Sequence, residues 1–246
     1  MKIQDYLKAE TEELYRQLSL AGANIQLEVD ETVPCWRVEE LPTFKITAPS
    51  LEPSAAAIAH ELLHVKLSMQ GYVNPRIIYS YFNETNSIFT PDFITILDNN
   101  VAHFKMIDAF LDMGFNVDEF LVDTPKAYFI NSILLSIVRL QLAHKAGIAN
   151  LCEETREIIQ LVAGAKLFGL YKAKDPTTKN GLHEDAILIP LKEINSTLIE
   201  KLDELFNDWT EANTVNNLEF YRRLNFPLKE IGIPNAADCA GIIFPI

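Results

Sequence analysis

Cysteine is scarce in this chain. Cys35, Cys152 and Cys239 are the only three among 246 residues, and no two of them form a C-x-x-C pair. An odd number of widely spaced cysteines predicts neither a disulfide framework nor a zinc site built from thiolates. Such cysteine usage is typical of a reducing compartment, and we expect the protein to be cytoplasmic.

Positive charge is also in short supply. The chain has 21 Lys and Arg against 34 Asp and Glu, which gives a formal net charge of −13. Nucleic acids and anionic membrane surfaces are bound through clustered Lys and Arg, and the sequence has no such cluster. We therefore expect no nucleic-acid partner. The acidic excess suits a basic or neutral polypeptide substrate, although it also serves solubility alone.

No apolar run is long enough to cross a bilayer. The most apolar stretch, residues 128–143, is interrupted by polar residues such as Asn131 and Arg139 and is shorter than a membrane span. Residues 1–8 lack the apolar segment of a secretory signal. With 48% hydrophobic residues, the chain still has enough apolar side chains for a sizeable core. We expect one globular domain over residues 1–246 with no membrane span, and an oligomeric state that the sequence leaves open.

Hydrophobic periodicity predicts a predominantly helical α+β fold. Two β-rich runs, residues 25–29 and 44–48, indicate a small mixed or antiparallel sheet within about 25–48, with edge character because Pro34 and Pro42 interrupt it. Capping residues, glycines and apolar spacing predict helices at 3–19, 51–69, 91–113, 124–147, 149–172, 196–209 and 214–224. The part of the chain from 124 to 246 is thus helical. The loop at 175–181 is either a mobile lid or a connector.

One motif points to metal chemistry, the segment His60-Glu61-Leu62-Leu63-His64 within the predicted helix 51–69. Helical residues four apart lie one above the other, so two imidazoles can hold one tetrahedral ion while the Glu stays beside its open position. The rest of this helix is almost entirely apolar, which indicates that the motif faces the interior. A divalent cation would partner all three polar groups at once. The alternative is a pair of hydrogen-bonded core histidines.

This motif resembles the signature of the zincin metallopeptidases, a helical H-E-x-x-H with uncharged flanks. The resemblance implies a zincin-like helical core preceded by an edge strand along which substrate lies, and Phe44–Ala48 is the candidate strand. Lys66 departs from the apolar residue that is usual two positions after the second His. The chain lacks both the H-x-x-G-x-x-H continuation of metzincins and the downstream E-x-x-x-D of thermolysin-like enzymes, so the resemblance stops at the superfamily.

His103 is the predicted third metal ligand. It shares the apolar arc of the predicted helix 91–113 with Ile96 and Ile107, and zincins place the third ligand on the helix after the motif helix. Asn100 also lies in this arc and could support a ligand, whereas Asp98 and Lys105 fall on the polar side, where we expect Asp98 to be solvated. The competing ligand candidates are His183, His144, Asp92 and Asp108, of which His144 is better explained as a charge at a helix end.

Three such ligands would leave Zn²⁺ one open position for a water whose pKa falls towards 7. Glu61 would take the proton as this water attacks an amide carbonyl and return it to the leaving nitrogen. The predicted function is therefore zinc-dependent hydrolysis of peptide bonds in a peptide or protein substrate. Two alternatives stay open: a zinc-binding regulatory or interaction protein without turnover, and a helical protein without metal. The candidate second donors to the oxyanion, each better explained as a packing residue, are Tyr72, Tyr79, Tyr81 and Tyr128.

Overall fold

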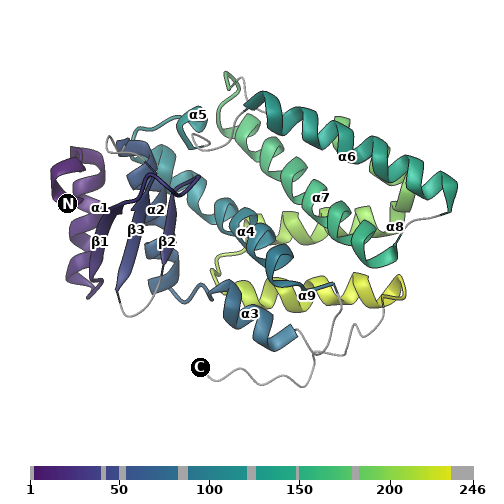
Figure 1. Ribbon diagram of the computed structural model, residues 1–246, viewed down its shortest axis with the longest axis horizontal. Coiled ribbons are helices and arrows are strands. Elements are labelled where there is room, and N and C mark those ends of the chain that lie inside the picture. The colour runs from purple at the N-terminus through teal and green to yellow at the C-terminus, as the bar shows by residue number, and fades with distance from the viewer. Residues whose placement is uncertain are drawn as a thin grey trace.

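The computed structural model describes residues 3–39, 43–49, 54–82, 88–120, 126–147, 150–178 and 183–233, with the side chains of Glu10 and of residues 126–131 left out. It confirms a predominantly helical α+β fold with a small N-terminal sheet. Figure 1 shows this sheet at one end of the molecule, with the long C-terminal helices at the other. None of the described helices is long and apolar enough to cross a membrane.

The N-terminal region consists of a 3-10 turn, one helix and three strands. The turn η1 (Ile3–Tyr6) leads into α1 (Ala9–Leu20), and the strands are β1 (Ile25–Val29), β2 (Arg37–Glu39) and β3 (Phe44–Ala48). The sheet is mixed, with order β1-β3-β2: β3 pairs in parallel with β1 and antiparallel with β2. Ile46 and Ala48 are fully buried.

The expected edge position of Phe44–Ala48 is wrong, because β3 is the central strand. The alternation of Phe44, Ile46 and Ala48 with Lys45 and Thr47 predicts a half-buried strand, but it does not say how many neighbours that strand has. Within the described residues the sheet edges are β1 and β2. Any peptide laid along this sheet would therefore meet one of these two strands.

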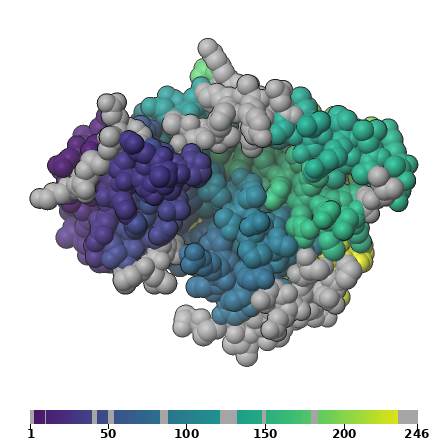
Figure 2. Space-filling model, in the orientation of Figure 1, coloured from purple at the N-terminus to yellow at the C-terminus, as the bar shows by residue number. Residues whose placement is uncertain are grey.

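The helical part is organised around α4 (Pro91–Asp112), which contacts α2 (Ala55–Met69), α3 (Pro75–Phe82), the one-turn α5 (Val117–Phe120), α7 (Leu151–Lys174) and α8 (Glu184–Glu211). Two further helices, α6 (Lys126–Ala146) and α9 (Asn217–Glu230), each pack on α8. In Figure 2 the segments around α4, in blue, lie between the N-terminal region in purple and α6 and α7 in green. A helix so surrounded has few solvated positions.

Local signals set the ends of the two central helices, and α2 begins at Ala55 instead of the predicted residue 51. The Ser54 side chain accepts a hydrogen bond from Ala57 N at 3.0 Å and caps α2. Thr90 caps α4 through Phe93 N, with Pro91 at the first helical position. Gly114, just after α4, has a positive φ of 88°, a conformation that glycine adopts without strain. These caps set the positions at which the histidines of α2 and α4 lie.

The helical part also departs from the predictions. The predicted helix 196–209 is only the second part of α8, whose first part includes the short apolar run 186–191 outside any predicted helix; α8 bends at Asn195 (φ −153°, ψ 85°). The Asn195 side chain caps the second half by accepting from Leu198 N at 3.0 Å. The short helices α3 and α5 were not predicted, because eight and four residues are too few to show a helical period.

Candidate metal centre

The structure brings the three predicted histidines together. His60 and His64 lie one turn apart on α2, and His103 reaches them from α4, which packs directly on α2. The Nε2 atom of His60 lies 3.2 Å from Nε2 of His64 and 3.2 Å from Nε2 of His103. Among the described residues, these side chains are the one group of three or more potential ligands whose donor atoms all lie within 4.8 Å of one another.

These distances fit a tetrahedral ion. Imidazole nitrogens bound to zinc at about 2.0 to 2.1 Å and tetrahedral angles lie about 3.3 Å apart. Both pairs that involve His60 match this spacing. Three imidazoles are also the protein ligands of one well-known class of catalytic zinc site, which keeps its fourth position for water or substrate. The donor set therefore fits Zn²⁺ in number and type, and in the spacing of both pairs that involve His60.

The orientation of the His60 ring leaves one nitrogen for a metal. The Phe120 backbone carbonyl accepts a hydrogen bond from this ring. Because Nε2 faces the other two histidines, the donor to Phe120 is Nδ1, and neutral His60 then has a single lone pair at Nε2. Two further ring nitrogens lie at 3.2 Å from that lone pair, and it can accept from only one of them. A purely hydrogen-bonded histidine cluster is thus incompletely satisfied, whereas a cation would use all three lone pairs.

Partial or full burial keeps the three imidazoles neutral: His103 is buried, and His60 and His64 are half-buried. Burial lowers the pKa of His60 to about 3, with a smaller contribution from His64, and lowers the pKa of His64 to about 4. The pKa of His103 lies well below its ordinary value, first because of burial and then because of His60 and His64. Neutral imidazole is the form that binds a metal. At neutral pH no proton has to leave these rings before an ion enters.

Two more residues bear on this cluster, Glu61 through its place in the sequence and Phe120 through direct ring contact. Glu61 follows His60 on α2 and is buried, with 5% of its surface exposed, although a carboxylate is costly to bury. The Phe120 ring packs on two imidazoles, with ring centroids 4.6 Å from His60 and 4.9 Å from His103. The centre is therefore enclosed by aromatic surface on one side, which strengthens electrostatic interactions within it.

The competing ligand candidates lie elsewhere. His144 is exposed near the end of α6, 3.6 Å from Glu154, and His183 is exposed at the start of α8. Asp108 is exposed and pairs with Lys174 at 2.7 Å, and Asp92 is exposed in the first turn of α4. None of the four belongs to the histidine cluster. Asn100, the suggested supporting residue, is half-buried one turn before His103.

The expectation that Asp98 is solvated is wrong. Its side chain is 4% exposed, and its Oδ1 accepts from Asn217 Nδ2 at 2.8 Å, from the Tyr72 hydroxyl at 3.1 Å and from the Tyr221 hydroxyl at 3.2 Å. Asn217 also exchanges two hydrogen bonds with the backbone of Val73. This Asp98 network joins α4 to α9 and to the segment that follows α2. Tyr72, one of the candidate oxyanion donors, is therefore already used by Asp98.

Lys105 is not fully solvated either, although the helical wheel places it on the polar side of α4. Its ammonium donates to the backbone carbonyls of Trp209 and Ala212, the latter at 2.7 Å, and lies 4.4 Å from the centroid of the Trp209 ring. Partial burial lowers its pKa to about 8. The cation thus caps the C-terminal end of α8. The prediction for Ile96 is wrong in the opposite direction: the helical wheel places this residue in the buried arc, and it is 53% exposed.

The remaining tyrosines and the loop are only partly described. Tyr79 and Tyr81 pack on the core as partly buried residues, and the side chain of Tyr128 lies outside the described residues. Of the predicted loop, residues 175–178 are described and 179–181 are not. Thr178 is buried, and its hydroxyl donates to Asp118 of α5 at 2.6 Å. The first half of this loop is therefore held against the segment that carries Phe120.

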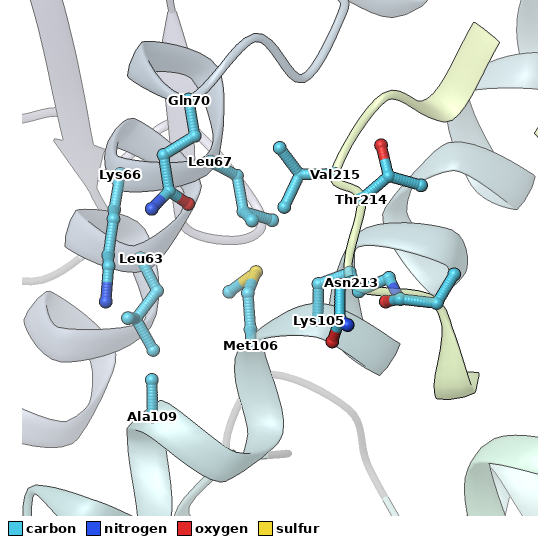
Figure 3. A pocket seen from close by; sticks show the side chains of 11 residues that line it. Leu63, Lys66, Leu67, Gln70, Lys105, Met106, Ala109, Asn213, Thr214 and Val215 are labelled. Carbon is cyan, nitrogen blue, oxygen red and sulfur yellow. The ribbon is translucent and has the colours of Figure 1, made fainter. Parts of the chain in front are cut away.

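A pocket of about 130 Å³ lies between α2, α4 and the connection from α8 to α9. Figure 3 shows Leu63 and Leu67 of α2 facing Met106 of α4 and Val215, with Lys66 at one side. None of the three clustered histidines lines it. This pocket is accordingly separate from the metal centre.

No protein family, no curated protein and no solved structure matches this chain. The geometry of the centre is therefore the basis for assigning its chemistry.

Proposed function

We propose that this protein is a zinc-dependent hydrolase of the zincin type, which cleaves peptide bonds with Glu61 as general base. One observation carries the proposal: the neutral imidazoles of His60, His64 and His103 converge, with both nitrogen pairs that involve His60 at zinc-like spacing, and the buried Glu61 follows His60 on the same helix. The zinc ligands are His60, His64 and His103. The cysteine usage supports a reducing compartment such as the cytoplasm.

Each residue then has a defined task. A bound zinc ion supplies Lewis acidity, polarising the substrate carbonyl and lowering the pKa of a water to about 7. Glu61 accepts the proton that this water loses and delivers it to the leaving nitrogen. The Phe120 carbonyl holds the His60 ring so that Nε2 stays available. The Phe120 ring excludes bulk water from one side of the imidazoles.

A second candidate function is zinc binding without turnover, in a regulatory or interaction role. It is favoured by the packing of Phe120 on the site and by the low exposure of His103, 8%, which restrict access for a substrate. The carboxylate of Glu61 argues the other way, since a protein that only binds zinc needs no base at this position. Turnover distinguishes the two.

The test combines metal content with hydrolysis. Wild type, Glu61→Gln and His60→Ala are purified without chelator, assayed for zinc by atomic absorption and screened against a peptide library. Wild type should hold one zinc per chain and cleave peptides. Glu61→Gln should keep the zinc and lose about two to four orders of magnitude in rate, because glutamine cannot accept the proton. His60→Ala should lose the zinc.

Two exposed residues provide matched controls, His183→Ala and Glu200→Gln, which should change neither quantity. A wild type that neither contains zinc nor takes it up on titration would overturn the proposal. Zinc binding without cleavage of any peptide would favour the second candidate.

A further inference from the structure

One buried hydroxyl in the neighbourhood of the metal centre is left without a partner. Tyr171, near the end of α7, is 1% exposed, and its hydroxyl has no hydrogen-bond partner within the described part of the chain. Buried polar groups in native proteins are satisfied in the great majority of cases, so an exception calls for a physical explanation. A phenylalanine would fill the same space without burying an unpaired donor. The hydroxyl therefore carries a cost that packing does not explain.

Its position suggests what offsets that cost. The ring of Tyr171 lies 5.9 Å from the Phe120 ring, and Phe120 itself contacts the rings of His60 and His103 at 4.6 and 4.9 Å between centroids. Only one aromatic ring thus links Tyr171 to the histidine cluster. The hydrogen bond between Thr178 and Asp118 ties the segment after α7 to α5 on the same side.

We propose that Tyr171 donates a hydrogen bond to the substrate carbonyl oxygen as that oxygen gains negative charge, once the Phe120 ring has moved aside. The inference rests on the proposed function and deepens it. Hydrolysis of an amide needs a donor that is already oriented and desolvated where the oxyanion develops. Burial raises the pKa of Tyr171, so the phenol keeps its proton and remains a donor. Tyr72, in contrast, already donates to Asp98.

The test uses Tyr171→Phe with Tyr221→Phe as a matched control, because Tyr221 is equally buried but bonded to Asp98. In metal-free protein, Tyr171→Phe should melt at the same temperature as wild type or higher, whereas Tyr221→Phe should melt lower. Acetohydroxamate, a metal-binding anion that offers oxygens in place of the substrate carbonyl, is then titrated into the cobalt-substituted proteins. Its affinity should fall about tenfold in Tyr171→Phe, the loss of one hydrogen bond to a charged oxygen, and stay unchanged in Tyr221→Phe.

The role of Phe120 is tested by Phe120→Ala, which keeps the backbone carbonyl that holds His60. This variant should bind acetohydroxamate faster than wild type. If acetohydroxamate associated with Phe120→Ala no faster than with wild type, the proposed displacement of the Phe120 ring would be wrong.

The outcomes separate this inference from the proposed function. Normal metal and acetohydroxamate binding in Tyr171→Phe would overturn the role of Tyr171 and leave the zinc centre standing. A clearly lower melting temperature for metal-free Tyr171→Phe would show that the hydroxyl has a structural partner, which also overturns it. Failure of the wild type to bind zinc would overturn both.

Discussion

Replacing Asp98 by alanine is expected to destabilise the folded protein by about 3 kcal/mol, although this residue does not belong to the histidine cluster. The carboxylate is buried and accepts hydrogen bonds from Tyr72, Asn217 and Tyr221. Burial, followed by the charge of Asp98, raises the pKa of both phenols, so each stays a donor. The substitution removes an acceptor that three buried donors share.

The size of this loss in stability depends on which hydrogen-bond acceptors each donor keeps after the substitution. The Tyr72 hydroxyl keeps the backbone carbonyl of Asp98 at 2.9 Å, and the Asn217 amide keeps that of Val73 at 2.9 Å. Tyr221 loses the one acceptor that its hydroxyl is seen to use, which costs about 1 to 3 kcal/mol for a buried unpaired group. Weakening of the other two charge-assisted bonds adds about 0.5 kcal/mol each, which brings the total to about 3 kcal/mol. Asp98→Asn keeps a neutral acceptor and should cost about half as much.

Urea unfolding measures these changes, with stability taken from the midpoint at constant slope. A loss of about 3 kcal/mol corresponds to a fall in melting temperature of about 6 to 12 °C for a chain of this size. The control is Asp112→Ala, an exposed residue at the end of the same helix, which should change stability by less than about 0.5 kcal/mol. If Asp98→Ala costs no more than Asp112→Ala, the buried network is not what holds α4 to α9.

Two predictions concern the histidines. His103→Gln should lower zinc affinity by at least about 100-fold in a competition titration with a chromogenic chelator, whereas His144→Gln should not; equal affinities would exclude His103 as a ligand. The pKa values of His60 and His64 in the folded protein, about 3 and 4, lie below the ordinary 6.5. Between these folded values and pH 6.5, the unfolded chain therefore binds more protons than the folded chain. The stability that these neutral rings contribute is complete above pH 6.5 and is lost as pH falls through the folded values. The urea midpoint of the metal-free wild type should therefore fall more steeply between pH 6.5 and 4 than that of a His60→Gln, His64→Gln double variant, and parallel curves would refute the burial of these rings.

Signals close together in the sequence predicted this protein best. Thr90, Pro91 and Gly114 lie at the ends of α4 and set its bounds within two residues, because capping depends only on nearby backbone groups. The spacing of His60 and His64 is of the same kind, since residues four apart on a helix face the same way. These parts of the prediction required a local pattern and nothing else.

Predictions that depended on distant parts of the chain failed more often. The helical wheel assigns α4 one buried face, whereas helices contact it on several sides, and so Asp98 is buried and Ile96 is exposed. The partners that make burial of Asp98 possible, Asn217 and Tyr221, lie more than a hundred residues away. Strand order is equally non-local, which explains why the sequence predicts an edge position for β3 although this strand is central. The juxtaposition of His103 with α2 was inferred through the family resemblance, because its helical position alone also fitted a core histidine.

Buried polar groups that have hydrogen-bond partners and those that lack them lie in different parts of this structure. This chain satisfies even charged groups when they are structural: Asp98 has three side-chain donors, and Lys105 has two backbone carbonyls. Around Phe120 the pattern reverses, with one His60 lone pair facing two nitrogens and the Tyr171 hydroxyl facing none. Apart from Thr47 on the central strand, Tyr171 is the sole buried hydroxyl of the described residues without a partner. Since natural sequences break local rules mainly where binding or catalysis compensates, we propose that the exceptions beside Phe120 belong to one site, which a cation and a substrate oxygen would complete together.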